Sequence, residues 1–186
     1  MVESEAGKGS TFTLILPIID HKIVTDINDD GLKQKLTKRL RSAINNEQRA
    51  LVVEDYEGNV VILSFLMEEI GLNYDIARNG QEALNLWHEN HYDVVLMDVQ
   101  MPILDGLSAT KAIRKLEQEN KLPETPIIGM TAHALVEDRQ KCIDSGMSDY
   151  LPKPLDSDRL KEKIFNFIRE SKVQTAYMQD NKKTGS

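Results

Sequence analysis

Five residues with chemically active side chains each follow a short apolar segment of this sequence. They are Glu54, Asp55, Asp98, Thr131 and Lys153. The apolar segments are too short for typical helices and therefore predict buried strands. If these strands are parallel, the five side chains meet at one edge of one sheet, which is where open α/β sheets place their chemistry.

Three of these side chains are carboxylates, those of Glu54, Asp55 and Asp98. Two unit charges about 4 Å apart repel each other by about 4 kcal/mol at an effective dielectric constant of about 20. Three neighbouring carboxylates must therefore bind protons or a cation. Oxygen ligands favour Mg²⁺, which commonly bridges carboxylates and phosphate oxygens. Zinc is disfavoured, because these loops carry no His or Cys at ligand spacing.

The two other side chains suit a phosphoryl group. Lys153 would supply a compact positive charge and Thr131 a hydroxyl donor. Together they could stabilise a transferring phosphoryl group, whose transition state depends on positioning and charge. Asp98 is the expected nucleophile, because carboxylates form acyl phosphates. Each residue alone has an ordinary explanation as a turn, a cap or plain surface, so the prediction depends on their joint placement.

The elements that must position these residues alternate regularly from residue 50 to about 171. Strands are expected at 50–53, 73–77, 93–97, 127–130 and 149–151. Helices are expected at 59–70, 81–90, 107–118, 136–145 and 157–170. Five such units predict an α/β fold with a parallel five-stranded sheet covered by helices on both faces. Right-handed crossovers favour the flavodoxin-like strand order 2-1-3-4-5.

The flanking segments have a different pattern. Residues 1–19 predict a glycine-rich loop leading into one strand, and residues 172–186 a flexible polar tail. Residues 20–49 are typical of a linker, with one amphipathic helix expected over 32–45. Its apolar residues recur at every fourth position, namely Leu32, Leu36, Leu40 and Ile44.

The composition indicates which kinds of partner and which cellular compartment this chain favours. The net charge of −7 argues against nucleic acid, which requires a basic surface. No apolar stretch approaches the ~20 residues that span a bilayer, so we expect no membrane contact by this chain. No secretory leader is visible at the start. The single cysteine, Cys142, cannot form an internal disulfide, which favours the reducing cytoplasm.

Four segments carry a specific family pattern: residues 51–55 (LVVED), 95–106 (VLMDVQMPILDG), 127–132 (IIGMTA) and 150–154 (YLPKP). Over residues 50–171 the chain resembles the receiver domain of two-component response regulators. The resemblance implies that Asp98 accepts a phosphoryl group from a phosphohistidine with Mg²⁺. The donor would be the phosphohistidine domain of a histidine kinase, a histidine phosphotransfer protein, or both.

The same resemblance implies roles for the neighbouring residues. Asp55 and Asp98 would hold Mg²⁺ directly, Glu54 mainly through water, and the backbone carbonyl of Gln100 would complete the protein ligands. Thr131 and Tyr150 would be the switch residues that turn inward on phosphorylation. Lys153 would pair with phosphate or with Asp98, through a cis peptide bond to Pro154.

Two positions depart from the usual family pattern. Glu54 stands where an Asp is more usual, and its longer arm could change the metal geometry. Tyr56 stands where many members carry a small polar residue, which could alter access to the pocket. Neither departure removes an essential group.

The motifs are most similar to receivers fused to histidine kinases. Residues 4–12 (SEAGKGSTF) resemble the last glycine box of the kinase ATP-binding domain, and residues 13–17 its closing strand. A Walker phosphate loop is excluded, because Lys8 is followed by Gly9 and then by a strand. The rest of an ATP site is absent, so no ATP-dependent kinase activity is expected from this chain. The parent kinase could be membrane-anchored, and the exposed edge of the N-terminal strand could form a homo-oligomer.

Three other functions remain open at this point. A pseudo-receiver would use the same fold as an interaction scaffold without phosphorylation. A phosphohydrolase of the haloacid-dehalogenase type also uses an Asp nucleophile, but it needs a second Asp where this chain has Gln100. A flavin-binding module would place a Ser/Thr-rich phosphate loop where this chain has the acidic residues Glu54, Asp55 and Glu57.

Overall fold

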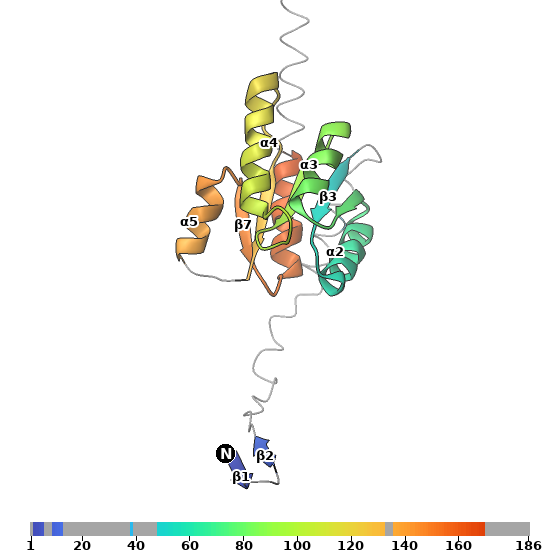
Figure 1. Ribbon diagram of the computed structural model, residues 1–186. Helices are drawn as coiled ribbons and strands as arrows, with labels where there is room; N and C mark the ends of the chain where they lie inside the picture. The colour runs from blue at the N-terminus through green and yellow to red at the C-terminus, as the bar shows by residue number, and fades with distance from the viewer. Residues whose placement is uncertain (1, 6–8, 13–37, 39–47, 133–135, 170–186) are drawn as a thin grey trace, which may run out of the picture. The chain divides into compact units, whose positions relative to one another are not determined.

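The computed structural model of the chain describes residues 2–5, 9–12, 38, 48–132 and 136–169 (Figure 1). The chain divides into two units, residues 1–31 and residues 32–186. None of the helices within the described ranges combines the length and the apolar character that crossing a membrane requires.

The first unit contains an antiparallel hairpin, which corrects the expectation of a loop leading into one strand. Strand β1 (Val2–Glu5) pairs with β2 (Gly9–Phe12), and Val2 lies opposite Phe12. Gly, Ser and Glu are weak strand formers, so residue preference alone did not indicate β1. Pairing between the two segments stabilises both strands. Residues 13–17, which were expected to form a closing strand, lie outside the described residues.

The second unit is the expected α/β domain. Its strands are β3 (Arg49–Val53), β4 (Asn73–Ala77), β5 (Val94–Asp98), β6 (Ile127–Thr131) and β7 (Asp149–Pro152). Its helices are α2 (Glu57–Ile70), α3 (Gly80–Glu89), α4 (Gly106–Asn120), α5 (Val136–Asp144) and a last helix over residues 157–169. Each of these elements was predicted to within two residues at either end.

The five strands form one parallel sheet in the order β4-β3-β5-β6-β7. In chain order this is 2-1-3-4-5, so the predicted flavodoxin-like topology is confirmed. The strand order reverses between β3 and β5, and a crevice at such a switch point is the usual ligand site of this architecture. The carboxyl ends of β3 and β5 therefore lie side by side.

Alternate strand residues face two separate cores, as the period of a strand requires. One core joins the sheet to α2 and the last helix, through residues such as Leu63, Met67 and Ile164. The other joins it to α3, α4 and α5 and includes Ile113 and the buried Cys142. Figure 1 shows α4 in front of the sheet and the red last helix behind it. Both faces of the sheet are covered, as a parallel sheet requires.

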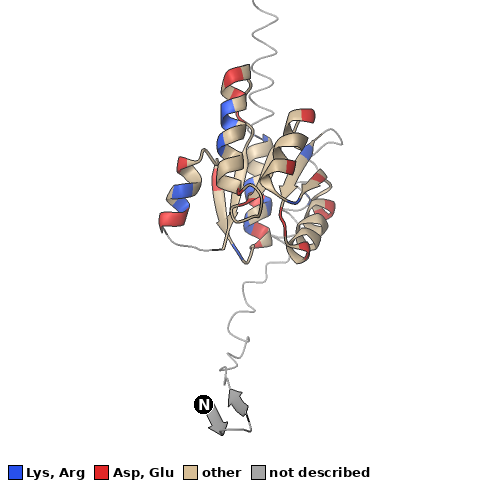
Figure 2. Cartoon of the chain, viewed as in Figure 1, with Lys and Arg blue, Asp and Glu red and all other residues tan. Residues whose placement is uncertain are grey.

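Side chains cap three of the described helices that begin near the carboxyl ends of the strands. The Asn79 side chain accepts a hydrogen bond from the Glu82 N–H at the start of α3, and Asp105 accepts one from the Ser108 N–H at the start of α4. Asp156 accepts from the backbone N–H groups of residues 158 and 159, which supports the last helix. Each such cap is worth about 1 kcal/mol. Acidic and basic residues are mixed along α4 and α5 (Figure 2).

Two sequence predictions lie mostly or entirely outside the described residues. Of the helix expected over 32–45, the structure describes Lys38 alone, and that residue is helical. The predicted flexible tail, residues 172–186, is not among the described ranges.

The start of α4 lies directly against the end of β5. The N–H of Gly106 donates to the carbonyl of Val99, and a Cβ at Gly106 would lie 2.0 Å from the carbonyl oxygen of Asp98. Only a residue without a side chain allows this approach. Gly106 therefore sets how closely the loop after Asp98 folds over the sheet edge.

We predict that Gly106→Ala destabilises the domain by about 3 kcal/mol, because backbone rather than a flexible side chain must move. Gly58→Ala is the matched control near the start of a helix. Its Cβ would meet only the Tyr56 ring, which is 66% exposed and can swing aside. That control should change stability by less than about 1 kcal/mol. Urea unfolding measures both variants, and equal losses would contradict the assignment.

Candidate functional site

Three carboxylates gather where β3 and β5 end. Asp98 is the last residue of β5, and Glu54 and Asp55 directly follow β3, which pairs with β5. One carboxylate oxygen from each residue lies within 4.8 Å of the other two. Glu54 and Asp98 are buried, whereas Asp55 is exposed. The structure thus brings together the three acidic residues predicted to share one edge.

Lys153 lies between two of these carboxylates. Its Nζ donates to Glu54 Oε2 at 2.7 Å and to Asp98 Oδ2 at 2.7 Å. Lys153 follows β7, and its backbone N–H donates to the Thr131 carbonyl at the end of β6. The Lys153–Pro154 peptide bond is cis, as the resemblance implied. The predicted pairing of Lys153 with Asp98 is present, and Lys153 pairs with Glu54 as well.

Burial controls the charge state of this group. Burial raises the pKa of Asp98, the hydrogen bond from Lys153 lowers it, and Glu54 raises it, with a net upward shift. Burial also opposes the charged form of Lys153, but its hydrogen bonds to Asp98 and Glu54 outweigh this and raise its pKa. Lys153 therefore stays an ammonium ion, and its one charge does not offset the cost of keeping Asp98 ionised.

The structure also places the three remaining predicted site residues, which are Thr131, Tyr150 and Gln100. Thr131 is the buried last residue of β6, one position beyond Met130, which pairs with Asp98. The N–H of Gln100 donates to Asp98 Oδ1 at 3.2 Å, so this loop contacts the predicted nucleophile. Tyr150 is half-buried in β7, and the Arg139 guanidinium of α5 lies 5.8 Å from its ring centre.

The sequence reasoning missed one polar contact of the site. Glu54 is fully buried, and its Oε1 accepts a hydrogen bond from Asn59 Nδ2 at 2.8 Å. Asn59 lies in the first turn of α2, where only the helical pattern was noticed. A polar side chain directly before the mostly apolar residues 60–67, five positions after a buried acid, was the available signal.

The sequence reasoning also missed an apolar surface on α2. Val61, Ile62 and Phe65 are 60%, 62% and 69% exposed, although α2 buries other apolar residues against the sheet. The signal was the almost unbroken apolar run of residues 60–67, because a helix with one buried face needs only about half of those positions to be apolar. Exposed apolar residues that cluster in this way mark interaction sites.

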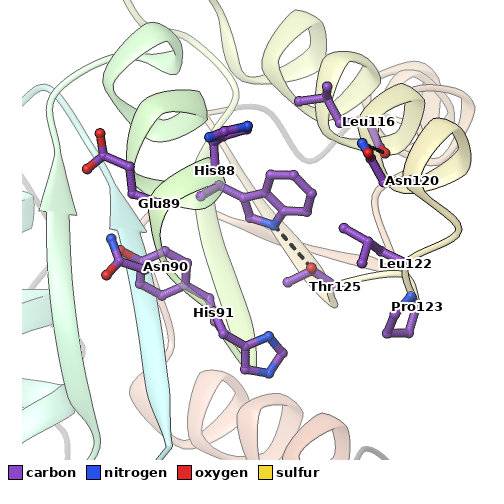
Figure 3. A pocket seen from close by; sticks show the side chains of 11 residues that line it. His88, Glu89, Asn90, His91, Leu116, Asn120, Leu122, Pro123 and Thr125 are labelled. Atoms are coloured by element: carbon purple, nitrogen blue, oxygen red, sulfur yellow. Dashed lines mark hydrogen bonds between the residues drawn. The ribbon is translucent and has the colours of Figure 1, made fainter.

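A separate hollow of about 640 Å³ lies at the opposite end of β5, lined in part by Trp87, His88 and His91 (Figure 3). Trp87 Nε1 donates to Thr125 Oγ1 at 3.1 Å on its wall. The carboxylates of the acidic group do not line this hollow. Its histidines are therefore not part of the acidic site.

The model of the response regulator receiver domain matches residues 50–165. The sensor protein ArcB of Escherichia coli is 32% identical over 98% of this chain and 22% of its own length. Hybrid signal transduction histidine kinase I of Dictyostelium discoideum is 39% identical over 74% of this chain and 8% of its own length. The chain thus spans less than a quarter of either relative.

Solved structures are similar over the same region. The receiver domain of sensor histidine kinase PA1611 from Pseudomonas aeruginosa, solved with magnesium coordinated in its active site cleft, is 36% identical. It aligns with a TM-score of 0.59 over 65% of this chain and 97% of that one. The receiver domain of Ssk1 from Saccharomyces cerevisiae, crystallised with the phosphotransfer protein Ypd1, is 35% identical. Its TM-score is 0.61, over 64% of this chain and 88% of that chain.

We predict that Lys153→Met, without divalent cations at pH 7, lowers the free energy of unfolding by about 3 kcal/mol. The reason is that two buried carboxylates lose the cation they share. Added Mg²⁺ should restore part of the loss. The control is Lys115→Met, whose pair with Glu119 spans 3.8 Å between exposed side chains and should be worth less than about 1 kcal/mol. Similar losses in the two variants under urea unfolding would contradict this prediction.

Proposed function

This chain belongs to the response regulator receiver domain family, and from that premise we propose that Asp98 takes a phosphoryl group from a phosphohistidine with the help of Mg²⁺. The observation that carries the proposal is the position of Lys153 Nζ, 2.7 Å from an oxygen of Asp98 and 2.7 Å from an oxygen of Glu54. At this position the Lys153 ammonium group would also contact a phosphoryl group attached to Asp98.

The donor set fits a hard divalent cation. Three carboxylates and one ammonium leave a net charge of −2 when all are ionised, which one divalent cation would neutralise. The acidic group contains only oxygen ligands, which suits Mg²⁺. We propose that Asp55 and Asp98 hold Mg²⁺ directly, Glu54 through water, and Gln100 through its backbone carbonyl. When bound, the cation would neutralise charge on the phosphoryl oxygens.

Asp98 would act as the nucleophile of the transfer. A carboxylate oxygen of Asp98 attacks phosphorus, the bond from phosphorus to the histidine nitrogen breaks, and that nitrogen keeps the electron pair. Lys153 then neutralises charge on the acyl phosphate that forms. Because Gly106 allows the following loop to fold closely over Asp98, the nucleophile is held on a rigid strand end. Positioning and charge of this kind provide most of the catalysis in phosphoryl transfer.

Phosphorylation would act on Thr131 and Tyr150 as switch residues. The phosphoryl group adds about −1.5 to −2 charges and strong acceptor oxygens beside the Thr131 hydroxyl. Tyr150 would exchange its contact with Arg139, worth about 0.5–1 kcal/mol at an exposed site, for an inward position. That exchange would change the surface formed by α5, β7 and the last helix, on which Arg139 lies. A charge-assisted hydrogen bond to the phosphoryl group is strong enough to offset the loss of the contact between Tyr150 and Arg139.

The exposed apolar face of α2 supports a protein as the phosphoryl donor. Val61, Ile62 and Phe65 lie six to ten positions after Asp55, and Ile103, 82% exposed, lies in the loop that follows Asp98. Apolar residues beside a phosphoryl site suit a helical partner that presents its phosphohistidine from an apolar surface. We propose that this partner is a histidine phosphotransfer protein or the phosphohistidine domain of a kinase.

The N-terminal region supports a kinase as the parent protein. ArcB is similar over 98% of this chain, and therefore over residues that precede the receiver domain. We propose that residues 1–19 are the end of a kinase ATP-binding domain, residues 20–49 a linker, and residues 50–171 the receiver. Cytoplasmic placement of the receiver, a membrane-anchored parent and association through the N-terminal strands remain parts of this proposal.

The phosphoacceptor assignment predicts that Asp98→Asn abolishes phosphorylation. The unaltered chain, incubated with acetyl phosphate and Mg²⁺, should gain one phosphoryl mass by intact mass spectrometry, and the variant should gain none. Asp144→Asn, an exposed residue at the end of α5, is the control and should be phosphorylated normally. A pseudo-receiver would leave the unaltered chain unmodified. Phosphorylation of Asp98→Asn would instead assign another nucleophile.

The docking assignment predicts that Phe65→Asp slows transfer from a partner but not from a small molecule. With a phosphorylated histidine phosphotransfer protein that phosphorylates the unaltered chain, the rate should fall by at least about tenfold, as for an interface hot spot. Acetyl phosphate should modify the variant at the normal rate. Leu122→Asp, a 50% exposed residue on the hollow of Figure 3, is the control. Equal slowing by both variants would exclude α2 as the docking surface.

A further inference from the structure

Asn59 holds the buried carboxylate of Glu54 from one side, and Lys153 holds it from the other. Asn59 Nδ2 donates to Oε1 at 2.8 Å, and Lys153 Nζ donates to Oε2 at 2.7 Å. The side chain of Glu54 is fully buried. A carboxylate has about four lone-pair sites, so these two donors leave two sites for further donors. Metal-bound water is a donor of the right kind.

The position of Asn59 in α2 explains how it reaches Glu54. Asn59 is the third residue of the helix, and its backbone N–H donates to the carbonyl of Tyr56 at 3.0 Å. At this position a longer polar side chain commonly turns back to the N–H of the N-cap residue. Asn59 instead donates to Glu54, the residue that directly follows β3. This bond ties the start of α2 to the end of β3, with no side-chain cap from Tyr56.

A glutamate at position 54 needs such a support more than an aspartate would. Its side chain has one more methylene group and one more rotatable bond, so the carboxylate can occupy more positions. Outer partners that orient a metal-site carboxylate typically change metal affinity by about 10- to 100-fold. The bond from Asn59 selects one carboxylate position, next to Lys153 and within 4.8 Å of the Asp55 and Asp98 ligand atoms.

We propose that Asn59 is a positioning residue for the cation site, which holds Glu54 where it can receive hydrogen bonds from the water shell of Mg²⁺. This inference rests on the proposed Mg²⁺ site. Asn59 contacts neither the cation nor the phosphoryl group, and it acts only through Glu54. Its effect therefore depends on the longer arm of Glu54, and a shorter acid at that position would not reach it in the same way.

A double-mutant cycle on the full chain tests this dependence. Isothermal calorimetry with MgCl₂ measures the Kd of the unaltered chain, Asn59→Ala, Glu54→Asp and the double variant. We expect Asn59→Ala to weaken Mg²⁺ binding about tenfold when Glu54 is present. In the Glu54→Asp background the same substitution should change the Kd less than about twofold. Equal weakening in both backgrounds, no weakening, or tighter binding would overturn the proposal.

Controls separate positioning from general support of the fold. Thermal unfolding without Mg²⁺ reports the structural cost of Asn59→Ala, which should exceed the cost of Asn85→Ala because a buried carboxylate loses a donor. Asn85 is an exposed asparagine of α3 that accepts a hydrogen bond from Gln81. Asn85→Ala should leave the Mg²⁺ affinity unchanged. If the unaltered chain binds no Mg²⁺, the proposed function fails. If it binds Mg²⁺ and the cycle shows no coupling, only the role of Asn59 fails.

Discussion

The ammonium group of Lys153 is the interaction on which the acidic edge of this domain depends. Glu54 and Asp98 are both buried, and an isolated buried charge is costly. Lys153 contacts both at 2.7 Å and so reduces the cost of bringing the two carboxylates together. Its one positive charge is insufficient for the whole group, because the exposed Asp55 adds a third carboxylate within 4.8 Å. This remaining negative charge makes the edge a site for a cation.

The surrounding fold explains why these groups are held so closely. The parallel sheet places the ends of β3 and β5 next to each other, and β6 and β7 bring in Thr131 and Lys153 from the other side. Gly106 lets α4 begin directly against the backbone of Asp98. Two apolar cores cover the sheet, so the strand ends cannot easily separate. The site is therefore rigid on the strands, while its contacts with partners come from helices and loops.

In the proposed function, helix α2 connects the cation site with the docking surface. Its first turn supplies Asn59 to the buried carboxylate, and its exposed face supplies Val61, Ile62 and Phe65 to solvent. Its buried face meanwhile packs on the sheet through residues such as Leu63 and Met67. Docking of a partner on this helix would act on an element that is hydrogen-bonded to the cation site. The proposed docking residues thus lie two to six positions after Asn59 on the same helix.

The sequence by itself determined the fold class and which side chains meet at the acidic edge of the sheet. Short apolar segments ending in Glu54, Asp98, Thr131 and Lys153 were sufficient, because parallel strands bring such ends to one edge whatever their detailed packing. The hairpin of β1 and β2 was missed, because β1 consists mostly of Glu and Ser, which are weak strand formers. Residue periodicity detects burial against a core, and this hairpin offers little of that signal.

Only the tertiary structure decided which groups actually contact one another. The sequence indicated that Lys153 would lie near Asp98, but the shared contact with Glu54 depends on the distance between residues 99 positions apart. The bond from Asn59 and the exposure of Phe65 likewise depend on how α2 is rotated against the sheet. The pattern of apolar and polar residues along a chain specifies its helices and strands and their order. Hydrogen bonds of 2.7–2.8 Å require side-chain positions that only the packing of these elements determines.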